Sequence, residues 1–212
     1  MNLSAMRSIL RSDLHDEDSG SYRWSDDELN RHIDRAVRDA SLASPLDAKA
    51  ALTTTAGSRD LSLDSLAGLL TVEAVEYPTD LYPPAYVPFN IWGDTLTLLV
   101  DSAPASAMSV NVYYGKLHTL DENGSTLPAS LEDVVATGAE GYAALEWASF
   151  ATNRVNAGGK DTWRDYLVWG EQRLASFTAA LARQGHRNGV RVRRLYTTPA
   201  EPAVNQADNL QY

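Results

Sequence analysis

The clearest helical pattern in the chain lies between residues 25 and 43. Apolar residues recur there every three or four positions, the spacing of one face of an α-helix: Leu29, Ile33, Ala36, Val37 and Ala40. Ser25 can cap such a helix, and Glu28, three residues later, completes a capping box. Trp24 before the cap and Leu29 after the first turn form a hydrophobic staple. The pattern therefore predicts a helix that begins at residue 25.

A shorter apolar stripe precedes this helix. In residues 3–12 the apolar positions Leu3, Met6, Ile9 and Leu10 fall on one side of a helix. The acidic residues 13–21 that follow are expected to form a solvated loop.

Between residues 50 and 116 the helical period disappears. Five runs are rich in β-branched and aromatic residues, and glycine and proline turns separate them: 51–55, 69–77, 85–92, 95–100 and 107–115. Gly93 and Asp94 between two of these runs predict a hairpin. Since the connections are short, the strands are expected to pair antiparallel in a small β-sandwich or meander.

Helical periodicity returns after Pro128. Ser130 with Asp133 predicts the cap of a helix that runs to about residue 156, before a Gly158–Gly159 stop. Gly138 and Gly141 lie inside this helix, where each glycine costs roughly 1 kcal/mol. Another backbone is therefore expected to pack closely against it.

A further helix is predicted over residues 160–184. Its apolar positions alternate at spacings of four and three: Trp163, Leu167, Gly170, Leu174, Phe177 and Leu181. This seam favours an antiparallel hairpin with the preceding helix, and the helix of residues 25–43 completes a small bundle.

These elements predict an α+β fold in four parts. Residues 1–49 supply the N-terminal helices of the bundle, 50–127 an inserted antiparallel β-domain, and 128–184 the helical hairpin. Residues 185–212 contain too little apolar surface to fold alone and predict an extended basic tail. Such a tail is expected to become fixed only on another polypeptide.

Composition narrows the possible functions. The 212 residues carry a net charge of −10, which argues against general binding to nucleic-acid phosphates. The absence of cysteine excludes disulfides and thiolate metal sites, and it fits a reducing cytoplasm. The sequence shows neither a signal-peptide core nor an apolar run that could cross a bilayer, so no membrane partner is expected.

The charge is uneven, because five arginines and no acid lie between Arg183 and Arg194. The run is either a basic helix end with a solvated tail, a DNA-contacting arm, or a docking segment. We favour docking, since arginine pairs with carboxylates in two-point contacts and apolar anchors follow the run. An extended segment over 190–197 could also add a strand to a neighbour's sheet. The candidate docking residues are Arg187, Arg191, Arg193, Arg194, Leu195 and Tyr196.

Catalytic and carbohydrate-binding sites are the competing interpretations. His118 with Asp121 or Ser125 could form a hydrolase site, but the segment has no GxSxG elbow, and Asn123–Gly124 indicates a turn. The four histidines lack metal-ligand spacing, so neither a metal nor a cofactor is expected. Three aromatic residues of the β region could instead serve a carbohydrate-binding face: Tyr82, Tyr86 and Trp92.

Two segments carry a resemblance to a known family: the capped helix "YRWSDDELNRHIDRAVRDAS" and the exit from the β region, "VNVYYGKLHTLDENGSTLPASLEDVVATGAEGYAALEWA". With the order of elements over residues 3–184, the chain resembles the head–tail adaptor (connector) proteins of tailed double-stranded-DNA bacteriophages. The resemblance implies a non-enzymatic virion protein at the head–tail junction, assembled in the host cytoplasm. Copies, typically twelve, would form a ring that extends the DNA channel below the portal protein and offers a platform to tail or nozzle proteins.

Within that family, the carboxy-terminal segment commonly docks on the portal. The resemblance therefore implies that residues 187–212 are the portal-binding arm. DNA would pass through the ring without specific binding, and an acidic body suits a channel wall because like charges repel. The alternatives remain a carbohydrate- or receptor-binding β-module of a phage tail and, second, a hydrolase that uses His118.

Overall fold

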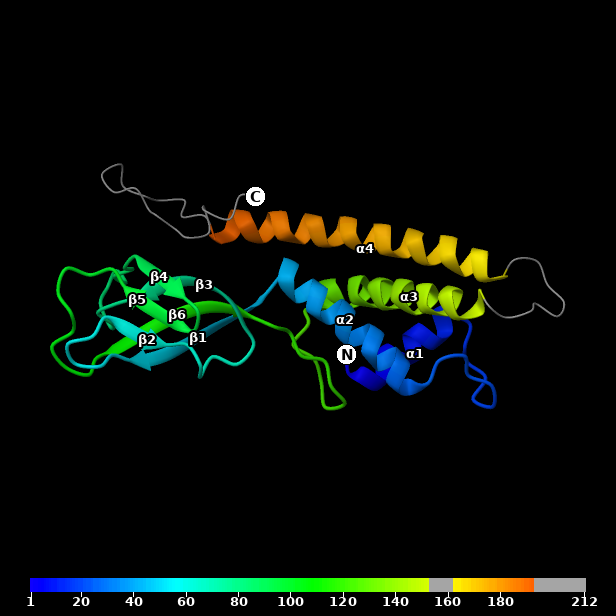
Figure 1. Ribbon diagram of the computed structural model, residues 1–212, viewed down its shortest axis with the longest axis horizontal. Coiled ribbons are helices and arrows are strands. Elements are labelled where there is room, and N and C mark those ends of the chain that lie inside the picture. The colour runs from blue at the N-terminus through cyan, green and yellow to red at the C-terminus, as the bar shows by residue number, and fades with distance from the viewer. Residues whose placement is uncertain (153–161, 193–212) are drawn as a thin grey trace. The chain divides into compact units, whose positions relative to one another are not determined.

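The computed structural model describes residues 1–152 and 162–192, which form two compact units. One unit is helical and combines Met1–Pro45 with His118–Val190; the other is strand-rich and consists, among the described residues, of Leu46–Leu117 with Arg191 and Val192 (Figure 1). The chain is therefore α+β, with the strands inserted between helical segments, as predicted. Residues His118–Leu127, at the predicted end of the β-domain, belong to the helical unit.

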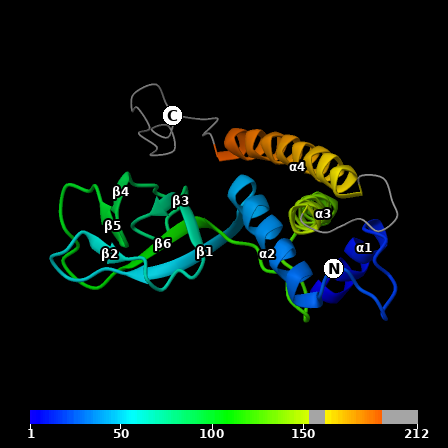
Figure 2. The same ribbon diagram turned by 45° about the vertical axis from the view of Figure 1, so that its right-hand side comes forward.

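The helical unit contains α1 (Leu3–Asp13), α2 (Asp26–Ala43), α3 (Ala129–Ala151) and α4 (Thr162–Val192). Figure 2 shows α3 end-on, with α4 on one side of it and α1 and α2 on the other. The predicted capping box of α2 is confirmed. The Ser25 amide donates to Glu28 Oε2 at 2.7 Å, and the Glu28 amide donates to Ser25 Oγ at 3.3 Å. The predicted apolar stripe of α2 is buried in the core of the unit.

The cap predicted for α3 is wrong. The helix begins at Ala129, and Pro128 occupies the N-cap position without any side-chain hydrogen bond. Ser130 lies inside the first turn, because the fixed φ of Pro128 (−66°) already directs the chain into the helix. The helix ends at Ala151, and the predicted stop at Gly158–Gly159 lies outside the described residues.

Helix α4 runs further than predicted, to Val192 instead of about residue 184. The sequence prediction ended the helix at about residue 184, because residues 185–212 contain little apolar surface. The next proline is Pro199, and arginine and glutamine around Gly185 are good helix formers, so the helix continues through it. The first part of the predicted tail is consequently helical, and residues 193–212 lie outside the described part of the chain.

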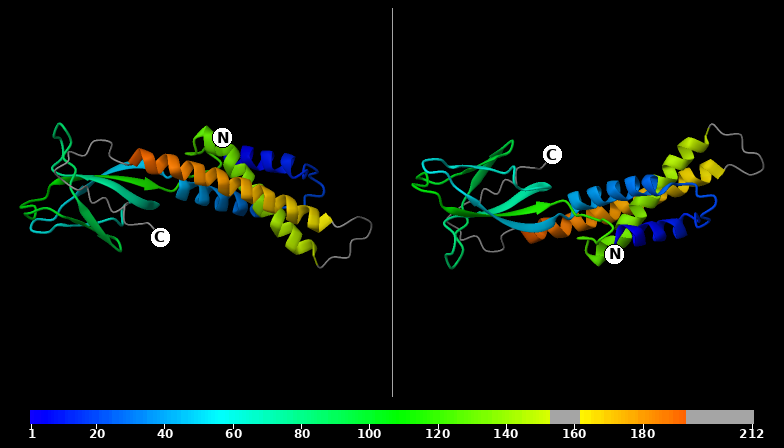
Figure 3. Two further views of the ribbon diagram at one scale, coloured as in Figure 1. Left: turned by 90° about the horizontal axis from the view of Figure 1, so that it is seen from above. Right: turned by 90° about the horizontal axis from the view of Figure 1, so that it is seen from below.

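Helices α3 and α4 approach each other closely and cross obliquely (Figure 3). A Cβ atom placed on Gly141 would lie 2.8 Å from the Leu174 side chain and 3.2 Å from the Gly170 carbonyl oxygen. One placed on Gly138 would lie 2.8 Å from the Phe177 ring. The close approach expected from the two glycines is thus observed. Near the start of α4, however, Tyr166 and Trp169 pack against the core rather than the predicted Trp163 and Leu167.

This contact gives a matched pair of predictions. Gly141→Ala should lower the free energy of unfolding by about 1–3 kcal/mol, because overpacking outweighs the better helix propensity of alanine. Gly185→Ala in α4 should raise it by up to about 1 kcal/mol, because the nearest atom to its new Cβ would be 4.0 Å away. Urea unfolding of both variants checks the pair, and equal effects would contradict the close α3–α4 contact.

The strand-rich unit contains six strands: β1 (Leu46–Thr53), β2 (Asp60–Ser62), β3 (Leu69–Glu76), β4 (Phe89–Trp92), β5 (Thr95–Leu98) and β6 (Ser109–Lys116). They form two antiparallel three-stranded sheets, ordered β1–β6–β3 and β2–β5–β4. The predicted Gly93–Asp94 hairpin is confirmed, since Trp92 pairs with Thr95 and Gly93 has a φ of +58°. The sheets share one core, which favours the sandwich over the meander: Leu61, Leu63, Leu66, Val75, Leu96, Leu98, Val110, Val112 and Tyr114.

Candidate functional site

The predicted docking residues fall at and beyond the end of α4. Arg187 and Arg191 lie in the helix, whereas Arg193, Arg194, Leu195 and Tyr196 are outside the described residues. Because the helix continues to Val192, the positions of Arg183, Arg187 and Arg191 are four residues apart on one helix face. Arg183 is exposed. The helix thus aligns three basic positions. Two of them, Arg187 and Arg191, were expected from the sequence to lie in an extended tail.

His118 occupies a structural position. Its side chain is buried, its Nδ1 lies 2.9 Å from the Thr126 carbonyl oxygen, and its Nε2 lies 3.0 Å from the Ser44 carbonyl oxygen. The backbone amide of His118 donates to Ser41 Oγ in α2 at 3.0 Å. Both ring nitrogens therefore face backbone carbonyls and tie the 118–127 loop to the end of α2.

The two proposed partners of His118 also have structural contacts. Asp121 Oδ1 accepts hydrogen bonds from the amides of Asn123 at 2.8 Å and Gly124 at 3.0 Å. Ser125 Oγ accepts one from the Leu127 amide at 2.9 Å. These contacts build the turn expected at Asn123–Gly124, and they do not assemble the nucleophile–base pair that a hydrolase requires.

The three aromatic residues considered for a carbohydrate face differ in exposure. Tyr82 is 99% exposed and Trp92, next to the hairpin turn, is 87% exposed. Tyr86 is less exposed, and its ring meets that of Tyr113 edge-on at 6.0 Å. Tyr82 and Trp92 are thus available to a partner, whereas Tyr86 already packs on β6.

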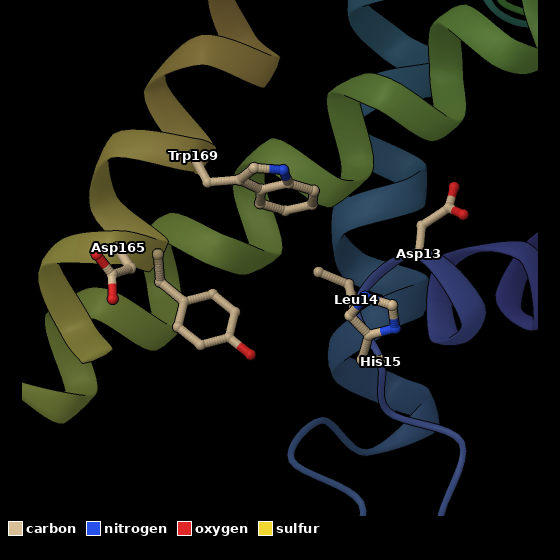
Figure 4. A pocket seen from close by; sticks show the side chains of 6 residues that line it. Asp13, Leu14, His15, Asp165 and Trp169 are labelled. Carbon is tan, nitrogen blue, oxygen red and sulfur yellow. The ribbon is translucent and has the colours of Figure 1, made fainter. Parts of the chain in front are cut away.

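A pocket of about 220 Å³ lies in the helical unit, between the end of α1 and the first turns of α4 (Figure 4). Asp165 and Trp169 line it from α4, and Asp13, Leu14 and His15 line it from the opposite side. Tyr166 completes the lining. Trp169 already has a cationic neighbour, because the Arg173 guanidinium lies 5.0 Å from its ring centre.

Beside the pocket, Glu140 of α3 is a buried acid that the sequence interpretation missed. It is 2% exposed, and its Oε2 lies 2.9 Å from Arg173 Nε without a well-aligned hydrogen bond. Burial, and then hydrogen bonding to Asp13, raises the pKa of Glu140 from its ordinary 4.5 to about 8. Its carboxyl group is therefore protonated at neutral pH and joins α1, α3 and α4.

Arg11 of α1 forms a second buried polar cluster. Its guanidinium donates to Asp16 Oδ2 at 2.8 Å and to Asp26 Oδ1 at 2.6 Å. It also lies 3.5 Å from the centre of the Tyr22 ring. Asp16 is 4% exposed, so the acidic loop is not simply solvated as predicted. Arg11 holds the loop against the start of α2, and its hydrogen bond lowers the pKa of Asp26.

The described residues contain no group of His, Asp or Glu that could hold a metal ion. Within the same part of the chain, none of the helices combines the length and apolar character that a membrane span needs.

Comparisons with known proteins add little. No protein-family model matches the sequence, and no curated protein matches it either. Among solved structures, the chain is similar to a protein from the neck of an empty GTA particle computed with C6 symmetry. The TM-score is 0.31 at 15% identity, covering 95% of this chain and 93% of the other.

A second similar structure is the neck of a native GTA particle computed with C12 symmetry. Its TM-score is 0.28 at 13% identity, covering 93% of this chain and 94% of the other. Scores of this size do not establish a shared fold.

Proposed function

We propose that the chain is a structural head–tail adaptor of a phage-like virion, and that it acts by binding rather than by turnover. Its copies form a ring, expected to contain twelve, that docks on the portal protein and extends the DNA channel toward tail or nozzle proteins. The arm that docks begins at Arg187 and includes the six candidate residues up to Tyr196.

The observation that carries the proposal is the basic end of α4 on an otherwise acidic chain. Arg183, Arg187 and Arg191 share one helix face, and Arg193 and Arg194 follow directly. A helix with arginines at regular spacing suits a carboxylate-bearing protein surface, because guanidinium groups bind carboxylates in two-point contacts. The net charge of −10 works against the same arginines binding DNA.

In the described helical unit, the polar residues that could have formed a catalytic site make structural contacts instead. His118, Asp121 and Ser125 serve the fold. The buried Glu140 lies beside Arg173 of α4, and the buried Arg11 pairs with Asp26 at the start of α2. These contacts stabilise the helical unit, and this favours a binding role.

Removing residues 187–212 should leave a folded protein that no longer joins the portal. The double variant Arg187→Ala/Arg191→Ala should weaken joining by about a hundredfold, since each of the two lost charge pairs at an interface costs about tenfold. Arg31→Ala/Arg38→Ala, which removes two exposed arginines of α2, is the matched control. Co-sedimentation with portal rings measures the binding of the truncated chain, the double variant and the control. Binding that is unchanged by the truncation would refute the assignment of residues 187–212 as the portal-binding arm.

A carbohydrate- or receptor-binding module is the second candidate, because Tyr82 and Trp92 are almost fully exposed. It predicts glycan affinity in the isolated chain that is lost in Trp92→Ala. That substitution should change the free energy of unfolding by less than about 0.5 kcal/mol, since the side chain is in solvent. A glycan array without hits would remove this alternative.

A further inference from the structure

We propose that the pocket between the end of α1 and the first turns of α4 binds the guanidinium group of an arginine from another polypeptide. The pocket lies within the helical unit, and the proposal involves none of the residues assigned to portal docking. The size of the pocket favours a single side chain. Its volume of about 220 Å³ is below the roughly 300–1,000 Å³ of pockets that enclose whole small-molecule ligands.

Two aromatic residues of α4, Tyr166 and Trp169, form one wall of the pocket. Aromatic rings attract cations, and a planar guanidinium group also stacks on them. Both rings already have such a neighbour within the chain. Arg173 lies 5.0 Å from the centre of the Trp169 ring, and Arg23 lies 5.7 Å from that of Tyr166. Neither arginine is among the residues that line the pocket, so the parts of the rings that face it remain available to a further cation.

The walls are held in place before a partner binds. The Tyr166 hydroxyl accepts a hydrogen bond from Arg23, and the Tyr166 ring meets that of Trp24 edge-on at 6.2 Å. Trp169 packs against the core of the helical unit. Leu14, which lines the pocket opposite Trp169, is 3% exposed (Figure 4). A pocket with fixed walls loses little conformational entropy on binding, and this favours recognition of a single side chain.

The charge of the lining favours a cation over an anion. Asp13 at the end of α1 and Asp165 in the first turn of α4 lie on opposite sides of the pocket (Figure 4). The remaining titratable residue of the lining is His15. Carboxylates repel anions and bind guanidinium groups in two-point contacts. Together with the aromatic wall, they match the two parts of an arginine side chain, its charged fork and its flat face.

The α1 side of the pocket offers a favourable place for a cation. Asp13 is the last residue of α1, where the helix dipole favours positive charge over an acid. The carboxyl group of the buried Glu140 hydrogen-bonds to Asp13, and Arg173 faces Glu140 from α4. A guanidinium group in the pocket would place positive charge beside Asp13 and therefore interact favourably with this end of the helix.

Titration of the full-length protein with a short arginine peptide tests the proposal. The probe is acetyl-Gly-Arg-Gly-amide, and the readout is the indole N–H signal of Trp169 in a two-dimensional nitrogen–proton NMR spectrum, assigned with the variant Trp169→Phe. The other four of the five tryptophans report binding elsewhere. We expect a saturable shift of the Trp169 signal with a Kd of about 1–10 mM, since one side chain brings few contacts.

Two further peptides serve as ligand controls. The citrulline peptide has the shape of the arginine peptide without its charge, and it should bind about tenfold more weakly or less. The lysine peptide should bind about threefold more weakly or less, because an ammonium group neither stacks on a ring nor forms two-point contacts. Equal binding of the citrulline peptide would overturn the proposal, and so would equal binding of the lysine peptide.

A pair of charge variants separates the pocket from the net charge of the protein. Asp165→Asn, at an exposed position of α4, should weaken binding of the arginine peptide about two- to fivefold. Glu171→Gln removes the same charge at another exposed position of α4 and should leave binding unchanged. Equal effects of the two variants would overturn the proposal. So would an unshifted Trp169 signal at about 50 mM peptide, where a site of this affinity is mostly filled.

Discussion

Replacing Arg11 by alanine is expected to lower the free energy of unfolding of the helical unit by about 3–5 kcal/mol. Removing one partner of a buried ion pair leaves the other charge buried without compensation, which is more costly than losing the pair as a whole. In this variant Asp16 would be left as the unpaired buried charge, because it is 4% exposed and accepts a 2.8 Å hydrogen bond from Arg11. The substitution also removes the link to Asp26 at the start of α2.

Urea unfolding followed by tryptophan fluorescence measures this loss. A Trp92→Phe background leaves four tryptophans, and all of them lie in the helical unit. Arg31→Ala is the matched control: Arg31 pairs with Glu146, but its side chain is 61% exposed, so at most about 1 kcal/mol should be lost. A similar small loss for Arg11→Ala would contradict the structural role of the cluster.

Glu140→Gln should stabilise the protein increasingly as the pH rises. The pKa of Glu140 is raised from 4.5 to about 8 in the folded state, so the folded chain holds a proton that the unfolded chain releases. Its contribution is therefore fully present below pH 4.5 and is lost as the pH rises to about 8. The loss amounts to about 1.4 kcal/mol per pH unit at most, or roughly 5 kcal/mol in total.

Glutamine keeps the uncharged form at every pH and removes this slope. The variant and the natural chain should have similar stability at about pH 4–5, and the variant should be several kcal/mol more stable at about pH 9. Chemical unfolding across this range measures the difference. The control Glu171→Gln, at an exposed position of α4, should change the free energy of unfolding by less than about 0.5 kcal/mol. The same result for Glu140→Gln would contradict its burial as a protonated acid.

Sequence patterns predicted the elements whose determinants are local. Ser25 and Glu28 define the start of α2 within four residues, and Gly93–Asp94 defines a hairpin within two. The glycines of α3 predicted a close neighbour because the cost of a glycine in a helix needs a packing reason. The fold class followed from these signals.

The buried polar clusters could not be predicted in this way. Glu140 and Arg173 lie 33 positions apart, and each resembles an ordinary surface residue in the sequence. Only the packing of α1, α3 and α4 gives them a buried environment. Arg11 and Asp16 are close in sequence, but their burial depends on Trp24 and α2. The end of α4 was missed because the residues after 184 lack an apolar stripe, although most of those up to Val192 are compatible with a helix.

The register between β1 and β6 has a consequence for how the chain can be rebuilt. Leu46 and Lys116, the two ends of the inserted unit, are direct partners in an antiparallel pair, so their Cα atoms are about 5 Å apart. A short turn could therefore replace all residues between them and rejoin the helical segments. The strand-rich unit is thus an insertion whose two ends meet at one point of the chain.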